Sequence, residues 1–319
     1  MNDAVRIMRA MRASSSDPAS LTSESVPVPD PGPGELLVEV GRTAITAGER
    51  SWPDCWPAIP CHDMSGVVAA AGDGADGWRS GDEVYGLVGF DRPGAAAEYV
   101  TAPAADLAPK PASVDHLSAA AIPLGGLTAW QALHEHARLT AGQHVLVHGG
   151  AGGVGAYAVQ LAALAGARVT ATASARDLAF VAGLGARDVL DYSGRFEDHV
   201  RDVDVVIDPV GGTATSRSWP VMRSGGTLVA IAEEPDPGQG GRGDVRGVYF
   251  VVRPDGGQLR ELAALVDKQQ LRPTVSAVFE LAALPEAFQA QRAPRLPGKV
   301  IIRVRHLGGG SDRGSRRSG

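Results

Sequence analysis

A glycine-rich turn between an apolar run and an apolar-periodic segment carries the clearest chemical signal in the chain. The run at 145–148 is short enough for a buried strand. The turn after it reads G-x-G-x-x-G, and its members are Gly150, Gly152, Gly153, Val154 and Gly155. A phosphate can approach a backbone only where no Cβ intervenes, and the amides at a helix start can donate to it. We therefore predict that this turn binds the pyrophosphate of a dinucleotide.

The segments around the turn predict a β-α-β unit. A helix that ends at Gly166 is indicated by apolar residues on one face, namely Val154, Ala158, Leu161 and Ala165. A second strand is expected over 167–172. The glycine pattern alone is a weak signal, because a glycine-rich turn can be a simple tight connection. Here, however, strand, turn, helix and strand follow in the order that the dinucleotide motif requires.

The residues after the second strand favour NADPH over NADH. An acid at the strand end would bond the ribose hydroxyls of NADH and repel a 2′-phosphate, and none is present there. Ser174 and Arg176 follow instead, and both can donate to a phosphate. Asp177 weakens this preference, and a solvated arginine at a helix start is the alternative interpretation.

Composition indicates an ordinary globular protein, since 319 residues can form two domains with substantial cores. A formal net charge of −6 argues against nucleic acid or an anionic membrane as a general partner. Charged, polar or glycine residues interrupt every apolar run, and the N-terminal segment lacks a secretory signal. Two cysteines, Cys55 and Cys61, are too few for a disulfide framework. We therefore expect a cytoplasmic protein without a membrane span.

Residues 1–120 are predicted to be β-rich. Strand-like runs at 36–40, 66–71, 81–88 and 96–100, separated by Gly/Pro turns, suggest a small barrel. A helical pattern over 117–137 follows, which Pro123 and the glycine pair at 125–126 should break or kink. After Ser174 the β-α alternation continues, which implies a doubly wound parallel sheet. Its predicted strands lie at 188–190, 203–208, 226–232 and 248–252, and its helices at 177–184, 213–222 and 256–271.

Matching segments along nearly the whole chain carry a family resemblance. They lie at 31–35, 66–68, 81–86, 97–99, 126–130, 149–155, 208–212 and 298–300. With them the sequence resembles the medium-chain dehydrogenase/reductase superfamily, in its zinc-independent quinone-oxidoreductase-like branch. The resemblance implies an α/β protein with a GroES-like β-barrel catalytic domain and a Rossmann domain, and an active site between them. The implied ranges are 1–122 and 273–306 for the barrel domain and 123–272 for the NADPH-binding domain, with a disordered tail at 307–319.

The chain departs from zinc-dependent relatives at the metal-binding positions. Those relatives carry a Gly-His-Glu motif and a lobe of four close cysteines, whereas this chain has Cys61, His62 and Asp63 in sequence and no such lobe. Adjacent residues rarely converge on one ion, and the corresponding positions near Thr46 and Gly126 offer no metal ligand. We expect no metal site. The family's usual Asn segment is also replaced, so the substrate-orienting residue is in doubt.

Candidate site residues fall into three groups. Glu49, His62 and Asp63 are candidates to supply a proton or to orient substrate, although each could be a structural polar residue. Trp52, Trp56 and Phe90 could form an aromatic wall for a flat substrate, or pack in a core. Further cofactor contacts are predicted at Thr128, beside the nicotinamide, and at Val210, Ala232, Phe250 and Val252. The resemblance also implies a contact of Tyr192 with the 2′-phosphate, because Tyr192 matches a position that touches this phosphate in quinone-reductase relatives.

A reductase without a Lewis acid must stabilise developing negative charge by hydrogen bonds, which favours conjugated acceptors. We expect hydride transfer from NADPH to a quinone or an α,β-unsaturated carbonyl. Two alternatives stay open: a reductase of enoyl thioesters or polyketide intermediates, and an NADPH-binding redox sensor or scaffold without turnover. Relatives commonly dimerise through an edge strand, so we expect a homodimer that uses residues 249–252.

Overall fold

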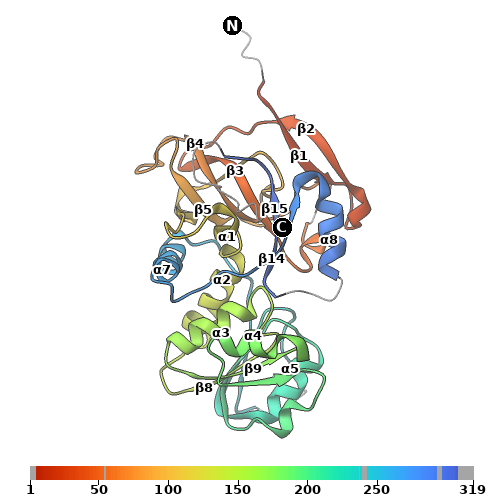
Figure 1. Ribbon diagram of the computed structural model, residues 1–319, viewed down its shortest axis with the longest axis vertical. Helices are drawn as coiled ribbons and strands as arrows, with labels where there is room; N and C mark the ends of the chain where they lie inside the picture. The colour runs from red at the N-terminus through yellow and green to blue at the C-terminus, as the bar shows by residue number, and fades with distance from the viewer. Residues whose placement is uncertain (1–4, 54, 237, 239–242, 293–296, 308–319) are drawn as a thin grey trace, which may run out of the picture.

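The computed structural model describes residues 5–307 except 54, 237, 239–242 and 293–296. The predicted disordered tail, apart from its first residue, lies outside the described residues. The chain forms two large sheets and one separate hairpin. Figure 1 shows the sheet that contains β3, β4 and β5 above the sheet that contains β8 and β9, with helix α2 between them. The expected α/β architecture is confirmed.

The lower sheet is parallel and has six strands. In spatial order they are β10 (Asp188–Asp191), β9 (Arg168–Ala173), β8 (His144–Val147), β11 (Val203–Asp208), β12 (Met222–Ala230) and β13 (Arg246–Tyr249). Numbered along the chain this is the order 3-2-1-4-5-6 of a doubly wound dinucleotide-binding sheet, as predicted. Its connecting helices include α3 (Gly155–Leu164), α4 (Leu178–Gly183) and α5 (Thr213–Ser218). The central strand β8 is buried along its whole length, which explains its continuous apolar sequence.

The upper sheet has seven strands and mixed pairing. In spatial order these are β14 (Val275–Glu280), β15 (Lys299–Arg303), β3 (Glu35–Ile45), β4 (Asp63–Ala71), β5 (Glu83–Leu87) and β7 (Leu107–Pro109), and β6 (Tyr99–Pro103) also pairs with β3. β15 pairs antiparallel with β3, so the predicted return of the C-terminal segment to this part of the fold is confirmed. That return brings residues about 250 positions apart side by side, which matters for the site described below.

Two helices, α2 (Pro123–Trp130) and α7 (Gly256–Asp267), pack between the two sheets. Two others, α1 (His116–Ala119) and α8 (Leu284–Arg292), pack against the upper sheet. Buried residues of β5, α2 and β8, such as Tyr85, Leu127 and Val145, belong to one hydrophobic cluster. Tyr85 also donates a hydrogen bond to the carbonyl oxygen of Leu259 in α7, at 2.5 Å. The cluster therefore fixes the upper sheet against the lower one.

Several predicted elements differ from the observed ones. The N-terminal hairpin of β1 (Ile7–Ala13) and β2 (Leu21–Pro27) was not predicted, because Arg and Ser interrupt the apolar residues of its strands. β13 ends at Tyr249, before most of the predicted strand at 248–252. The predicted helix at 213–222 stops at Ser218, where a short 3₁₀ turn containing Pro220 leads into β12.

The predicted break before Pro123 is confirmed, because α1 ends at Ala119 and α2 begins at Pro123. The glycine pair at 125–126 does not break the helix, contrary to the prediction. Pro123 occupies the first position of α2, where a missing N–H costs no hydrogen bond, and both glycines lie inside the helix. A Cβ at Gly125 would overlap the carbonyl oxygen of Gly153. Glycine is required here because α2 packs directly against the glycine-rich turn.

Candidate functional site

The glycine-rich turn has the geometry expected of a phosphate-binding loop. The amide of Gly150 donates to the carbonyl oxygen of Thr172 at 2.8 Å, which fixes the turn to β9. A Cβ at Gly155 would overlap the Gly149 carbonyl oxygen, and one at Gly150 would lie 2.9 Å from Val181. No side chain caps the start of α3 at Val154. A turn without intruding side chains, at an uncapped helix start, fits the pyrophosphate of a dinucleotide.

Lys299 is the residue of this site that was not predicted. It extends from β15, and its aliphatic stem lies against the turn, since a Cβ at Gly153 would lie 2.9 Å from Lys299 Cδ. Its ammonium lies 2.8 Å from Asp63 Oδ2 and donates to Thr46 Oγ1 at 2.7 Å. The segment at 298–300 contributed to the family resemblance, but nothing local in the sequence assigns the lysine a partner. A nearly buried cation therefore connects the glycine-rich turn with the upper sheet.

Asp63 is completely buried at the start of β4. Its Oδ1 accepts a hydrogen bond from the amide of Leu124 at 2.6 Å, and its Oδ2 faces Lys299. The hydroxyl of Thr43 donates to the backbone carbonyl of Asp63. The carboxylate therefore anchors the start of α2 as well as the lysine.

Glu49 is a buried acid that is neutral at neutral pH. It follows Gly48, whose φ of 84° is left-handed. Burial raises the pKa of Glu49 to about 8, against an opposing effect of Lys299. Cys61 Sγ donates to Glu49 Oε1 at 3.7 Å, whereas Glu49 Oε2 has no hydrogen-bond partner among the described residues. Burial and the nearby Glu49 raise the pKa of Cys61, which keeps it a thiol.

Three rings gather near these residues. Phe90 lies 5.1 Å, between ring centroids, from both Trp52 and His62, edge-on in each case. Trp52 is 37% exposed, so this cluster reaches the surface. His62 Nδ1 lies 3.1 Å from the carbonyl oxygen of Val88, so this nitrogen carries the proton and donates. Burial lowers the pKa of His62, which favours the neutral ring.

Trp56 lies apart from these three rings. It packs against a hydrophobic cluster that includes Leu284 and Phe288 of α8. The guanidinium of Arg50 lies 6.0 Å from the Trp56 ring and 5.4 Å from the Phe288 ring. The structure thus brings Trp52 and Phe90 together, as the predicted aromatic wall requires, but places Trp56 in a packing position.

The residues predicted to meet a 2′-phosphate lie together at the ends of β9 and β10. Ser174 directly follows β9, and the backbone amide of Tyr192 donates to the carbonyl oxygen of Ala173 at 3.0 Å. The Tyr192 side chain is exposed. Ser174 Oγ donates to Asp177 Oδ2, and Arg176 Nε lies 3.5 Å from the same oxygen. A carboxylate therefore already contacts two of the predicted phosphate donors.

The other predicted cofactor residues are placed differently. The methyl Cγ2 of Val210 would lie 3.1 Å from a Cβ at Gly149, so this exposed side chain borders the turn. Thr128 is buried and donates to the Leu124 carbonyl oxygen within α2, at 2.6 Å. Ala232 lies beside Gly211. Phe250 and Val252 are buried members of the main cluster, where Phe250 contacts the ring of His136 at 4.2 Å.

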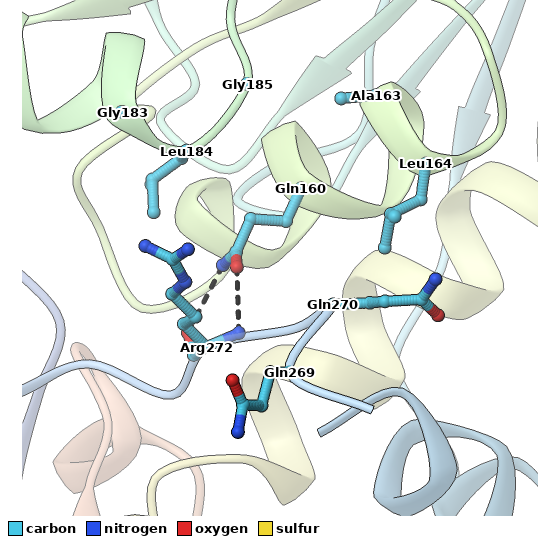
Figure 2. Close-up of a pocket in the computed structure, with 9 residues that line it drawn as sticks. All are labelled: Gln160, Ala163, Leu164, Gly183, Leu184, Gly185, Gln269, Gln270 and Arg272. Carbon is cyan, nitrogen blue, oxygen red and sulfur yellow. Dashed lines mark hydrogen bonds between the residues drawn. The ribbon is translucent and has the colours of Figure 1, made fainter. Parts of the chain in front are cut away.

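A separate cavity of about 290 Å³ lies away from these residues. It is formed near the ends of α3 and α4 and by the segment after α7 (Figure 2). Gln160 extends into it and bonds both the amide and the carbonyl of Arg272, at 2.8 and 3.3 Å, as the dashed lines in Figure 2 show. None of the predicted site residues lines this cavity.

Within the described ranges, no group of three or more His, Cys, Asp or Glu side chains is arranged to hold a metal ion. In the same part of the chain, no helix is long and apolar enough to cross a bilayer.

Comparisons with known proteins identify the family. Residues 32–112 match the model of the alcohol dehydrogenase GroES-like domain, and residues 184–302 match a model described as zinc-binding dehydrogenase. The chain is 30% identical to a probable zinc-binding oxidoreductase, mitochondrial, of Arthroderma benhamiae, over 89% of this chain and 93% of the relative. It is 32% identical to an NADPH-dependent alkenal/one oxidoreductase, chloroplastic, of Arabidopsis thaliana, over 77% of this chain and 64% of the relative.

A solved structure shows the same fold along the chain. The quinone oxidoreductase from Coxiella burnetii superposes with a TM-score of 0.88 at 29% identity, covering 94% of this chain and 100% of that one. The glycine-rich turn, the strand order of the parallel sheet and these matches agree. The chain belongs to the medium-chain dehydrogenase/reductase superfamily, in its quinone-oxidoreductase-like branch, and is an oxidoreductase.

Proposed function

We propose that this oxidoreductase transfers hydride from NADPH to a quinone or an α,β-unsaturated carbonyl compound. The observation that carries the proposal is the placement of Lys299. Its stem lies on the glycine-rich turn at Gly153, and its ammonium contacts Thr46 and Asp63 beside the buried acid Glu49. The cofactor loop and the candidate acceptor site therefore share one side chain. The names of the relatives, an alkenal/one oxidoreductase and a quinone oxidoreductase, agree with this acceptor class.

Binding of the cofactor is assigned to the turn and the start of α3. Bound NADPH supplies the hydride, while the chain supplies position and charge. Backbone amides at the uncapped helix start, with Lys299 close by, bind the pyrophosphate. Ser174, Arg176 and Tyr192 are proposed to meet the 2′-phosphate. Val210 borders the turn on its other side.

The proton that accompanies the hydride is assigned to Glu49. With a pKa of about 8 it holds a proton at neutral pH, and its Oε2 has no hydrogen-bond partner within the described part of the chain. The amide of Trp52 donates to the Glu49 carbonyl oxygen at 3.1 Å, which places the acid one helical turn from the Trp52 ring. Trp52, Phe90 and His62 hold a flat acceptor, and Glu49 donates to the oxygen on which charge develops.

We propose that the reaction does not use zinc, because the candidate ligands have other partners. Cys61 is a thiol bonded to Glu49, Asp63 is paired with Lys299, and His62 uses Nδ1 to bond Val88. Replacing these partners by a metal would leave Lys299 as a buried unpaired cation. Turnover should therefore be unchanged after treatment with a strong chelator.

A panel of acceptors tests the proposal. NADPH oxidation is followed with quinones, enones, enoyl thioesters, and simple ketones as the control. We expect turnover with quinones or enones and none with simple ketones. Turnover confined to enoyl thioesters would instead indicate a biosynthetic reductase. NADPH binding without oxidation of any acceptor would indicate a sensor.

The cytoplasmic location and the homodimer are also proposals. The small number of cysteines supports a reducing compartment, although two of the relatives are named as mitochondrial or chloroplastic. β13 is an edge strand of the parallel sheet. The side chains of Tyr249, its last residue, and of Val251, just beyond it, are exposed. Light scattering at several concentrations, with Val251→Lys as the variant, tests whether this edge forms the dimer.

A further inference from the structure

The side chain of Asp177 contacts two of the residues that are proposed to meet a 2′-phosphate. Its Oδ2 accepts a hydrogen bond from Ser174 Oγ and lies 3.5 Å from Arg176 Nε. The Asp177 side chain is only 12% exposed, whereas that of Arg176 is 49% exposed. A single carboxylate oxygen thus contacts a hydroxyl and a guanidinium that would both bind an anionic group.

We propose that Asp177 determines cofactor choice in this protein by competing with the 2′-phosphate of NADPH for Ser174 and Arg176. This inference rests on the proposed nicotinamide site and deepens it. A carboxylate normally discriminates against NADPH from the end of the second strand. Here Ala173 or Ser174 stands at that position, and the carboxylate belongs to Asp177, three or four residues further along the chain.

Two effects of the Asp177 carboxylate both lower the affinity for NADPH. For NADPH to bind, its phosphate must take over donors that the Asp177 carboxylate already uses, which removes part of the gain from those contacts. The 2′-phosphate also carries close to two negative charges. It must lie within a few ångströms of the negatively charged Asp177 carboxylate, which repels it. NADH has only a ribose hydroxyl at this place, and a carboxylate can accept a hydrogen bond from it. Asp177 therefore lowers NADPH affinity much more than NADH affinity.

A purely structural role makes a different prediction. Ser174 lies at the start of the 3₁₀ turn Ala175–Asp177, and the amide of Asp177 donates to the Ser174 carbonyl oxygen at 2.9 Å. If the side-chain contact only fixed this turn, its loss would affect both cofactors alike. Discrimination between cofactors, rather than overall affinity, is therefore the quantity to measure.

The test uses ligands that isolate the phosphate. Binding of 2′,5′-ADP and of 5′-AMP to the full chain is measured by calorimetry, and NADPH and NADH by fluorescence titration. Asp177→Asn keeps the shape of the side chain and removes its charge. The matched control is Asp188→Asn, which makes the same charge change at the opposite end of the β9–β10 pair, where Asp188 lies 4.0 Å from Arg168.

We expect Asp177→Asn to bind 2′,5′-ADP and NADPH about tenfold more tightly and to change 5′-AMP and NADH binding less than twofold. Asp188→Asn should leave all four affinities within twofold of the unchanged protein. In the double variant Asp177→Asn/Arg176→Ala the gain should be lost, because the guanidinium that would contact the phosphate is no longer there. Thermal unfolding of each variant shows whether the fold is retained.

Three results would overturn the proposal. They are an unchanged affinity ratio in Asp177→Asn, an equal gain in Asp188→Asn, and a change in 5′-AMP binding as large as that in 2′,5′-ADP binding. None of these binding measurements needs a hydride acceptor, so they remain valid even if no compound of the acceptor panel is reduced. If the unchanged protein binds NADH more tightly, the NADPH assignment fails, while a gain in Asp177→Asn would still establish the role of Asp177.

Discussion

Lys299 Nζ lies 2.8 Å from Asp63 Oδ2, and this ion pair joins the last strand of the upper sheet to β4 with almost no exposure to solvent. Two buried charges cost free energy to desolvate, so such a pair persists only when further hydrogen bonds satisfy both groups. Here Thr46 accepts from the lysine, and the amide of Leu124 donates to the aspartate. The pair therefore links the upper sheet, the start of α2 and the glycine-rich turn.

Removing one member of this pair should destabilise the fold strongly. Lys299→Met leaves the Asp63 carboxylate buried and unpaired, which should lower the free energy of unfolding by roughly 3 kcal/mol. Arg303→Met is the control on the same strand, because the exposed Arg303–Glu280 pair should contribute less than about 1 kcal/mol. Urea unfolding measures both. The double variant Lys299→Met/Asp63→Leu should recover part of the loss, and equal losses in Lys299→Met and Arg303→Met would contradict this view of the pair.

A methyl group in the glycine-rich turn should weaken dinucleotide binding strongly. Gly155→Ala places a Cβ on the Gly149 carbonyl oxygen, so the turn must shift, and we expect at least a tenfold weaker Kd for NADPH. Gly183→Ala is the matched control in a neighbouring helix, where nothing lies within 4 Å of the added Cβ. This control should bind NADPH normally and gain a few tenths of a kcal/mol in stability. Calorimetry and unfolding of the two variants provide the comparison.

The parallel sheet could be predicted well because its evidence is local. The buried strands β8 and β11 contain apolar runs, at 145–147 and 205–207, and the turn between strand and helix has its own glycine spacing. The C-terminal end of β13 could not be predicted, because the residues before and after Tyr249, from Val248 to Val252, are equally apolar. Periodicity shows that a strand exists but not where its pairing stops.

The site was harder to predict because its contacts join distant segments. Glu49, His62 and Asp63 were recognised as polar residues near one another, and Trp52 and Phe90 as aromatic residues. The partner of Asp63 is Lys299, which lies 236 positions later in the chain. Only the pairing of β15 with β3 brings the two residues together. The competing contacts of Asp177 depend on side-chain rotamers, on which sequence spacing gives no information. The glycine pair in α2 was misread because its reason, contact with Gly153, is also a tertiary one.

The aromatic cluster should contribute to acceptor binding without contributing much to stability. Phe90→Ala removes the ring that contacts both Trp52 and His62, so KM for a quinone or enone should rise about tenfold with a smaller change in kcat. Trp56→Ala is the comparison, because Trp56 packs near α8 and should mainly lower the unfolding temperature. Steady-state kinetics and thermal unfolding separate the two effects. A larger KM increase in Trp56→Ala than in Phe90→Ala would return Trp56 to the acceptor site.

Glu49 should make the protein less stable as pH rises from about 5 to 8. Its pKa is about 8 in the folded chain against an ordinary value of 4.5, so in this window the folded state holds a proton that the unfolded state has released. Such a group favours folding fully below its unfolded pKa, and this contribution is lost as pH rises through the folded pKa. Glu49→Gln mimics the protonated form. Its unfolding free energy relative to the unchanged protein should therefore increase by up to about 1.4 kcal/mol per pH unit, levelling off above pH ~8.

Glu35→Gln provides a control of opposite sign. The Arg92 guanidinium and the Gly32 amide bond Glu35 and lower its pKa, so its contribution is present above the unfolded pKa and is lost only as pH falls through the folded one. Between pH about 5 and 8 the Glu35→Gln difference should therefore stay flat. Urea unfolding at several pH values measures both curves. A flat Glu49→Gln curve would mean that Glu49 is ionised in the folded protein, and the proton in the proposed reaction would then have to come from another group.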